Sequence, residues 1–240
     1  MKVLEDIDRE VSRAVAFYWN TRKAQKEKQA TGGKSDAGLR SAVTGGAQMD
    51  GFVSLFAKIL EQAGISSECI FRKKLLELPG FFRPTKEWDL LVVKDKMLVA
   101  AIEAKSQVGP SFGNNFNNRT EEAMGSALDL WTAFREGAFN GGTAPFLGYF
   151  FMLEDCPASG KPVKVREPHY RVRPEFVGAS YMKRYELFCR KLVLERHYTS
   201  AAFITSKSDL GLKGIYDEPA KDIAVGKFAS GLAASIGAFI

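Results

Sequence analysis

The sequence predicts an α/β fold in which a mixed central sheet is flanked by helices on both faces. Apolar residues at helical spacing alternate along the chain with short, continuous apolar runs that are typical of buried strands. Two of these runs, WDLLVV and MLVAAIEAK, are joined by only three residues, which indicates a β-hairpin. Because the later runs alternate with helices, the order of elements predicts a sheet with helices on each side.

The first half of the chain is expected to contain two helices before the hairpin. An amphipathic pattern predicts a helix over residues 3–29, whose basic end, residues 22–28, is either a solvated helix end or an arm that faces phosphate. After two glycine-rich segments, TGGKSDAG and TGGAQMDGF, a second apolar face predicts a core helix over residues 52–63. A strand over residues 69–76 and a loop, LPGFFRPTKE, then lead to the hairpin.

A third helix is expected directly after the hairpin. Asn118 is placed to cap this helix, with Glu121 in the capping-box position, and the helix is expected to run to about Gly137. Its predicted buried stripe consists of Met124, Ala127, Leu128, Trp131 and Phe134.

The remainder of the chain alternates strands and helices. Strands are expected over residues 145–153 and 200–205, separated by a long helix over residues 175–197. Residues 220–240 are expected to form a closing helix.

The composition limits the class of protein. Hydrophobic residues make up 45% and charged residues 26% of the 240 positions, as in ordinary globular proteins, so disorder, collagen and coiled coils are excluded. The N-terminus lacks the pattern of a secretory signal and no apolar run is long enough to cross a membrane, so we expect a cytoplasmic protein without membrane contact. The net charge of +6 favours a polyanionic partner such as nucleic acid.

Cysteine and histidine offer no metal or disulfide pattern. The three cysteines are far apart and the two histidines, His169 and His197, lie elsewhere in the chain, so neither a disulfide scaffold nor a zinc site is expected. We assign neither histidine a catalytic role.

Glu103 and Lys105 place two charges on one face of an otherwise apolar strand, because residues two apart in a strand point to the same side. Unpaired charges near a sheet core are costly, so the pair is either a salt bridge at a sheet edge or part of a site. If the hairpin turns about Lys96, Asp89 lies opposite Glu103 on the same face. A turn one residue longer would place Asp89 opposite Ile102 unless a bulge restored the side.

Two carboxylates and an ammonium at one point suit phosphodiester hydrolysis. Carboxylate oxygens with little histidine favour a hard cation such as Mg²⁺, for which Asp89 and Glu103 are the candidate ligands. The metal would polarise the phosphate and activate water, while Lys105 orients that water or stabilises charge on the phosphorane, leaving a 3′-hydroxyl and a 5′-phosphate. Loss of any one of the three residues is expected to nearly abolish cleavage without unfolding the protein.

The order of these residues resembles a known superfamily. An Asp followed by Glu-x-Lys on adjacent strands is similar to the PD-(D/E)xK nucleases. Longer blocks, GGAQMDGF, KEWDLLVV and LVAAIEAKSQVGPSFGNNFNNRTEEAMGSALDLW, resemble the XhoI family of type II restriction endonucleases, most clearly over residues 40–155. Trp88 stands where Pro usually precedes the Asp, a departure that leaves the metal ligands intact.

The resemblance implies a restriction-endonuclease-like fold and a catalytic role for Asp89, Glu103 and Lys105. It further implies a Mg²⁺-dependent homodimer that cuts both strands of duplex DNA at the palindrome CTCGAG and leaves 5′ overhangs. A DNA methyltransferase acting on the same site is the expected partner in a restriction-modification system. In some superfamily members a further acidic residue assists, and here the candidates are Asp50 and Glu61, although a helix cap and a solvated helix face explain them more simply.

We expect one catalytic and DNA-binding domain, residues 1–240. It consists of an N-terminal helix, residues 3–29, a nuclease core, about residues 48–205, and a C-terminal helix, residues 220–240.

Two segments are candidates for contact with DNA. The segment QVGPSFGNNFNNR follows the catalytic strand and is rich in amides, which can pair with adenine in the major groove, although an asparagine-rich turn with a helix cap explains it as well. The basic segment KVREPHYRVRPEF carries arginines that could read guanine or bind phosphate. The candidate DNA-binding residues are Gln107, Asn114, Asn115, Asn117, Arg119, Arg166, Arg171 and Arg173.

Two other functions remain open at the level of sequence. A PD-(D/E)xK repair or junction-resolving nuclease would prefer branched or damaged DNA to a palindrome. A non-catalytic DNA-binding regulator would use Glu103 and Lys105 only to support its structure.

Overall fold

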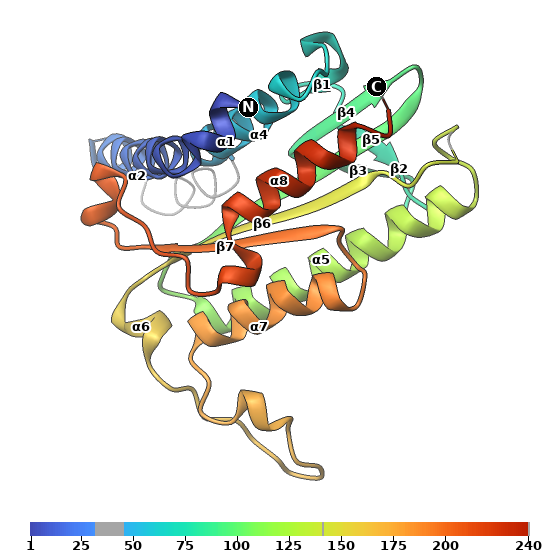
Figure 1. Cartoon of the computed structure of the whole chain (residues 1–240). Coiled ribbons are helices and arrows are strands. Elements are labelled where there is room, and N and C mark those ends of the chain that lie inside the picture. Colours follow the sequence, from blue (N-terminus) through green and yellow to red (C-terminus); the bar gives the residue numbers. More distant parts are fainter. Residues whose placement is uncertain (32–45, 141, 240) are drawn as a thin grey trace.

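The computed structural model describes residues 1–31, 46–140 and 142–239. Its centre is a five-stranded sheet in the order β1-β4-β5-β6-β7 (Figure 1). β1 pairs with β4 and β4 with β5 in antiparallel orientation, whereas β5, β6 and β7 are parallel, so the predicted mixed sheet is confirmed. The strands are β1 (Ile70–Phe71), β4 (Leu90–Lys94), β5 (Met97–Gln107), β6 (Phe146–Glu154) and β7 (Ser200–Ser206).

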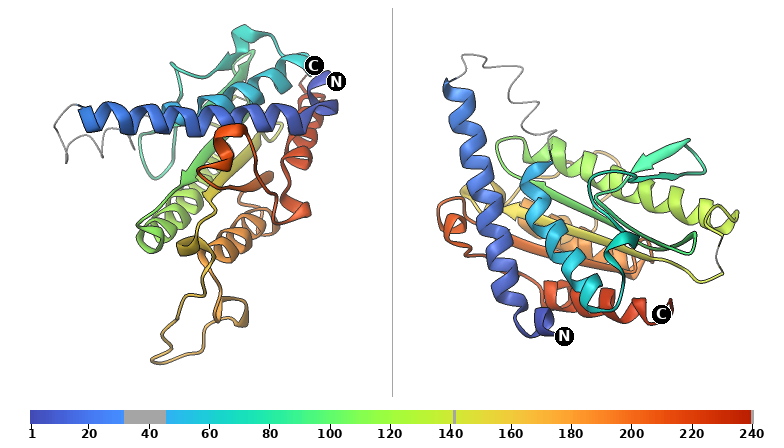
Figure 2. Two further views of the ribbon diagram at one scale, coloured as in Figure 1. Left: turned by 90° about the vertical axis from the view of Figure 1, so that its left-hand side faces the viewer. Right: turned by 90° about the horizontal axis from the view of Figure 1, so that it is seen from above.

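Helices cover both faces of this sheet, as the sequence predicts (Figure 1). One core lies under α1 (Lys2–Glu5), α2 (Ile7–Thr31), α4 (Asp50–Gln62) and α8 (Val225–Ile236). The other core lies under α5 (Phe112–Arg135) and α7 (Tyr181–Leu194). α2 and α4 lie side by side on the first face (Figure 2).

The central strand β5 contributes side chains to both cores. Ile102 and Ala104 are buried in the first core, whereas Ala101 is buried in the second. Because side chains alternate along a strand, Glu103 and Lys105 point toward the face that α5 and α7 cover.

Short elements complete the described chain. They are η1 (Ala47–Met49), η2 (Ser67–Cys69), β2 (Glu77–Pro79), β3 (Thr85–Glu87), α6 (Pro157–Gly160), η3 (Pro174–Phe176), η4 (Leu210–Lys213) and η5 (Lys221–Ile223). Most of the first glycine-rich segment, TGGKSDAG, lies outside the described residues.

The strand expected over residues 69–76 is wrong in its length. Only Ile70 and Phe71 pair with β4. Leu75 adopts a left-handed backbone with φ 59°, which interrupts an extended strand. Chain pairing resumes with β2 and β3, which form a two-stranded antiparallel sheet where the sequence suggests only a loop.

Asp129 of α5 fixes the turn between β2 and β3. Its carboxylate accepts the backbone N–H groups of Phe81 and Phe82 at 2.6 and 2.8 Å and the Nε of Arg83 at 2.6 Å. Burial raises the pKa of Asp129, but these donors outweigh burial and hold the pKa below its ordinary value. The carboxylate therefore stabilises this turn in its ionised form.

α5 begins at Phe112, six residues before the predicted cap Asn118, so the expected amide-rich loop is largely helix. Phe112 stacks on Tyr181 of α7 and Phe116 meets Tyr185 edge-on. This packing stabilises a first turn that asparagine, a weak helix former, would not stabilise alone.

The buried stripe of α5 also differs from the prediction. Met124 and Leu128 are 39% and 51% exposed, whereas the helix buries small residues toward the sheet. Ala127 is buried as expected, while Trp131 and Phe134 are partly buried. The residues that α5 buries, apart from Phe112, are Ala123, Ser126, Ala127, Asp129, Leu130 and Ala133.

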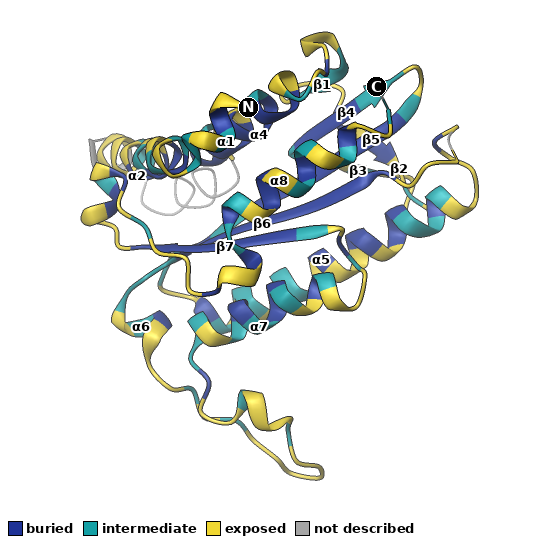
Figure 3. Ribbon diagram, in the orientation of Figure 1, coloured by how far each residue is buried: buried dark blue, intermediate teal, exposed yellow. Residues whose placement is uncertain are grey.

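α7 is shorter than the predicted helix over residues 175–197. Gly178 has φ 68°, which is incompatible with a continuing helix, and Ser180 then caps α7 by accepting the N–H of Lys183. Residues 161–178, here called the projecting segment, extend away from the body between α6 and α7 (Figure 1) and are almost entirely exposed (Figure 3).

The N-terminal and C-terminal helices differ from prediction mainly at their ends. The first helix is broken at Asp6 into α1 and α2. The closing helix starts at Val225 rather than Ala220, where η5 precedes it. Within the described ranges, no helix is both long enough and apolar enough to cross a membrane.

Candidate active site

The hairpin of β4 and β5 turns through two residues, Asp95 and Lys96. Both have left-handed backbone angles, φ 51° and 63°, which is the geometry of the tight turn that matches the twist of two antiparallel strands. Next to the turn, Lys94 pairs with Met97. The pairing next to the turn is therefore shifted by one residue from the pairing expected for a turn centred on Lys96.

A bulge decides where Asp89 lies. If the pairing next to the turn continued unchanged along the hairpin, Asp89 would lie opposite Ile102. The register shifts between Val92 and Val93, so that Leu90 pairs with Ile102 and Asp89, immediately before β4, comes level with Glu103. The N–H of Asp89 donates to the carbonyl of Ile102 at 3.2 Å, which fixes this position.

The three predicted catalytic side chains meet at one point. The Lys105 ammonium lies 3.0 Å from Asp89 Oδ2 and 3.2 Å from Glu103 Oε1. The N–H of Ala104 donates to the same Asp89 oxygen at 2.8 Å. Both carboxylates are therefore oriented toward one positive charge, with Asp89 partly exposed and Glu103 buried.

Glu103 has two further partners that sequence reasoning missed. Lys86 of β3 lies 3.3 Å from Glu103 Oε1 and its ammonium sits 4.2 Å from the centre of the Trp88 ring. The hydroxyl of Tyr198 donates to Glu103 Oε2 at 3.2 Å. Each oxygen of this carboxylate is thus held by a donor, which orients it as outer partners orient a metal ligand.

Burial and ion pairing act in opposite directions on these groups. Burial raises the pKa of Glu103, but Lys105 and Lys86 outweigh it and leave the pKa below its ordinary value. Burial lowers the pKa of Lys105, but Glu103 and Asp89 raise it above the ordinary value. For Lys86, burial prevails and the pKa is lowered despite the attraction of Glu103. The site therefore holds Glu103 ionised and Lys105 charged.

Asp89 and Lys105 line a cavity of about 490 Å³, whereas Glu103 and Lys86 are not part of its lining. It lies where α2, η1, the hairpin and the start of α5 come together. Its lining includes Arg22, Gln48, Asp89, Lys105 and Arg119. A phosphate that enters this cavity meets cationic groups from three separate elements.

The predicted amide-rich residues are only partly brought to the cavity. Asn115 and Arg119 line it, whereas Asn114 and Asn117 are exposed on α5 without lining it. Gln107 also lines it, but its side chain is buried and its Nε2 donates to the adjacent carbonyl of Val108 at 2.7 Å.

The predicted arginines of the basic segment lie elsewhere. Arg166, Arg171 and Arg173 are exposed on the projecting segment and none of them lines the cavity. Arg173 pairs with Glu175 at 3.2 Å. Neither histidine lines the cavity either, since His169 is exposed on the same segment and His197 follows α7.

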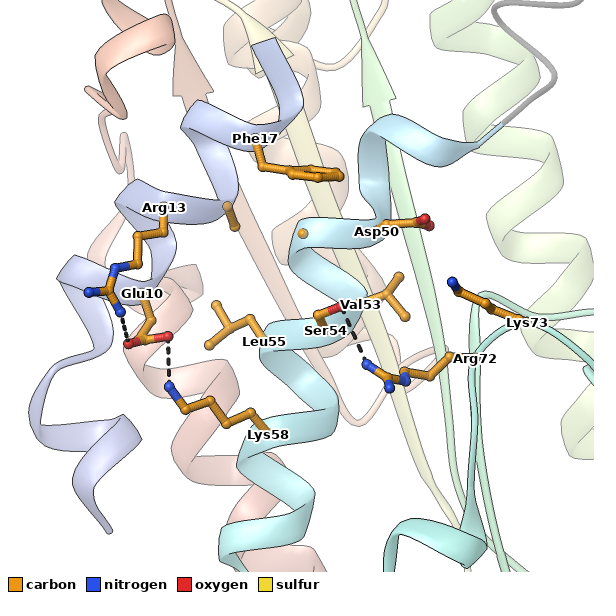
Figure 4. A pocket seen from close by; sticks show the side chains of 12 residues that line it. Glu10, Arg13, Phe17, Asp50, Val53, Ser54, Leu55, Lys58, Arg72 and Lys73 are labelled. Atoms are coloured by element: carbon orange, nitrogen blue, oxygen red, sulfur yellow. Dashed lines mark hydrogen bonds and ion pairs between the residues drawn. The ribbon is translucent and has the colours of Figure 1, made fainter. Parts of the chain in front are cut away.

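The two acidic candidates of α4 face other surroundings. Asp50 lines a different pocket, of about 450 Å³, between α2 and α4, where it points toward Lys73 (Figure 4). Glu61 is exposed near the opposite end of α4. The structure brings neither of them to the cavity of Asp89.

The acceptor set fits a magnesium ion better than zinc. Asp89 and Glu103 offer carboxylate oxygens, and Mg²⁺ is usually bound by one or two carboxylates while it keeps several waters. In the described part of the chain, no group of three or more His, Cys, Asp or Glu side chains could form an all-protein cage. The Lys105 ammonium, held between both carboxylates, shows that this point attracts positive charge.

Comparison with curated proteins finds several type II restriction enzymes. The chain is 58% identical over 206 residues to BstVI of Geobacillus stearothermophilus, covering 84% of this chain and 91% of that one. It is 47% identical over 194 residues to XhoI of Xanthomonas vasicola, with coverage of 80% and 77%. It is 50% identical over 169 residues to AbrI of Azospirillum brasilense, with coverage of 70% and 76%. No solved structure matches.

The sheet between two helical layers is a restriction-endonuclease-like fold, and these relatives make the protein a site-specific deoxyribonuclease. The family described as "Restriction endonuclease XhoI" matches residues 28–218. The chain therefore belongs to the XhoI family of type II restriction endonucleases, which hydrolyse phosphodiester bonds of duplex DNA.

Proposed function

We propose that this enzyme cuts both strands of the palindrome CTCGAG in a Mg²⁺-dependent reaction and leaves 5′ overhangs. The observation that carries the proposal is the convergence of Asp89, Glu103 and Lys105 beside one cavity, in a chain of the XhoI family. The target sequence follows from the family resemblance alone, so it is the part that the first experiment must test.

The chemistry assigns each side chain a separate task. Asp89 and Glu103 would hold a divalent cation, which when bound polarises the phosphate and lowers the pKa of water. Lys105 would turn its ammonium toward the water or the phosphorane charge. Water oxygen bonds to phosphorus, the bond from phosphorus to O3′ breaks, and O3′ takes up a proton, giving a 5′-phosphate and a 3′-hydroxyl.

Tyr198 and Lys86 hold the Glu103 carboxylate in this arrangement. When Lys105 serves the substrate, Glu103 keeps the Tyr198 hydroxyl on one oxygen and the Lys86 ammonium on the other. The buried carboxylate therefore remains paired and oriented.

Binding of duplex DNA would involve two surfaces. Asn115 and Arg119 of α5 line the cavity, and in this proposal they would contact DNA next to the cleaved bond. The projecting segment, with Arg166, Arg171 and Arg173, would reach the duplex farther away and bind phosphate or guanine.

The palindrome also implies the assembly. A two-fold symmetric site is read most simply by a two-fold homodimer, in which each single-domain subunit recognises one half-site. Because such an enzyme would also cut its host, we propose a DNA methyltransferase that modifies the same site and an enzyme that acts in the cytoplasm on unmodified DNA.

The test uses purified full-length protein and three DNA substrates. A plasmid with one CTCGAG site should be linearised in Mg²⁺ and remain intact in EDTA, with end sequencing showing 5′ overhangs. A plasmid without the site and a four-way junction should remain uncut. Cleavage of the junction in preference to the palindrome, or site binding without cleavage under any divalent cation, would contradict the proposal.

A further inference from the structure

Gln48 lies in the wall of the catalytic cavity, in η1 directly before α4. Its side chain is only 5% exposed, and its Oε1 has no hydrogen-bond partner among residues 1–31, 46–140 and 142–239. A buried carbonyl oxygen without a partner costs free energy, and buried polar groups in folded proteins are nearly always paired. Stabilisation of the fold therefore does not explain why a polar side chain lies in this wall.

We infer that Gln48 is a further active-site residue, whose carboxamide oxygen joins the oxygen shell of the cation held by Asp89 and Glu103, directly or through a water. This inference rests on the proposed function. DNA phosphate offers only acceptor oxygens, which an amide oxygen repels, so phosphate cannot satisfy Gln48 Oε1. A cation or its water can.

The surroundings of Gln48 favour this role. It belongs to the GGAQMDGF block, and the helical turn that carries it is closed by a hydrogen bond from the N–H of Met49 to the carbonyl of Gly46 at 2.8 Å. Met49 is buried in the first core and anchors the turn. The terminal torsion of glutamine is soft, so the amide can rotate toward the cavity at little cost while the backbone stays fixed.

A neutral acceptor also suits the charge of the site. Asp89 and Glu103 already place two carboxylates near the cavity, balanced by Lys105 and Lys86. A third carboxylate would add repulsion in the absence of metal. An amide adds an oxygen without adding a charge.

The experiment compares Gln48→Leu, Gln48→Glu and the control Gln62→Leu in the full chain. Gln62 belongs to α4 but lies outside the cavity lining, where its Oε1 accepts the N–H of Val3. Titration calorimetry with Mg²⁺ and with Ca²⁺ gives cation affinity, and thermal unfolding in EDTA gives stability.

Gln48→Leu should weaken cation binding about tenfold, yet leave the melting temperature in EDTA unchanged or higher, because it removes an unpaired buried oxygen. Gln48→Glu should bind the cation at least as tightly as the wild type. The control should show the reverse pattern, with lower stability and unchanged cation affinity.

Three results would overturn the inference. They are cation affinity within twofold of wild type for Gln48→Leu, an equal loss for Gln48→Glu, and a wild-type protein that binds neither ion. Because calorimetry requires no cleavage, a wild type that binds cations through Gln48 but does not cut CTCGAG would refute only the proposed function.

Discussion

Tyr198 offers a sharp test of how the active-site carboxylate is held. Its buried hydroxyl lies 3.2 Å from Glu103 Oε2 and also 3.2 Å from the carbonyl of Ala123. Burial raises the pKa of Tyr198 well above its ordinary value, so the hydroxyl keeps its proton and remains a donor. Tyr198→Phe removes this donor with almost no change of volume.

The expected loss follows from the charge of the acceptor. A hydrogen bond to a charged group contributes about 1.5–3 kcal/mol. In a domain of this size each kcal/mol moves the melting temperature by about 2–4 °C, so Tyr198→Phe should lower it by roughly 3–12 °C. Because Glu103 loses an orienting partner, Mg²⁺-dependent cleavage should fall about 10-fold to 100-fold.

Tyr149 provides the matched control. Its ring contacts Tyr198 at 5.2 Å between centroids and is equally buried, but its hydroxyl has no hydrogen-bond partner among the described residues. Tyr149→Phe should therefore leave stability unchanged or higher, and cleavage unchanged. Thermal unfolding and single-turnover cleavage measure both variants. Equal effects of the two substitutions, or a larger loss for Tyr149→Phe, would refute the account of Glu103.

Three further predictions concern catalysis, folding and DNA contact. Glu103→Ala should abolish cleavage while leaving DNA binding in Ca²⁺ measurable by anisotropy. It should also destabilise the fold by about 3 kcal/mol, because Lys86 and Lys105 lose a buried partner. Undiminished cleavage by this variant would contradict the prediction. Asp129→Asn should be about 1.5–3 kcal/mol less stable at neutral pH. Because the pKa of Asp129 is lowered in the folded state, the ionised carboxylate stabilises the fold at pH values above the ordinary aspartate pKa. This contribution is lost as pH falls through the lowered pKa, so the difference in free energy of unfolding between wild type and Asp129→Asn, measured with denaturant, should shrink in acid. A difference that stays constant with pH would argue against this role of Asp129. Arg171→Ala should weaken DNA binding uniformly across sequences and reduce the salt slope by about one, whereas a sequence-selective loss would indicate contact with a base.

Local periodicity predicts much of the fold and the centre of the site. The two-residue period of strands is enough to place Glu103 and Lys105 on one face. Asp89 lies opposite Glu103 as predicted, but for a less direct reason: the pairing next to the turn at Asp95 and Lys96 is shifted by one residue from the expected pairing, and a bulge farther along the hairpin offsets this shift. Left-handed angles at residues other than glycine leave no clear mark in a sequence.

The parts that sequence reasoning missed depend on contacts between distant segments. Tyr198 meets Glu103 across 95 positions of the chain, and no local pattern indicates that contact. Lys86 lies closer, three residues before Asp89, but only the pairing of β2 with β3 turns it toward Glu103. The early start of α5 depends on aromatic packing against α7, which overrides the weak helix propensity of its asparagines.

The most direct test of the central claim compares substitutions at the two ends of one hairpin. Asp89→Asn and Lys105→Met alter the proposed site, whereas Asp95→Asn and Lys96→Gln alter the exposed turn. Each variant is measured by single-turnover cleavage of a duplex with CTCGAG in Mg²⁺. The account predicts that the site variants lose at least about a thousandfold in cleavage rate while remaining folded, because metal binding and charge stabilisation each lower the barrier by several kcal/mol. The turn variants should stay within about twofold of the wild-type rate. A Lys105→Met enzyme that cuts within tenfold of the wild-type rate would contradict it.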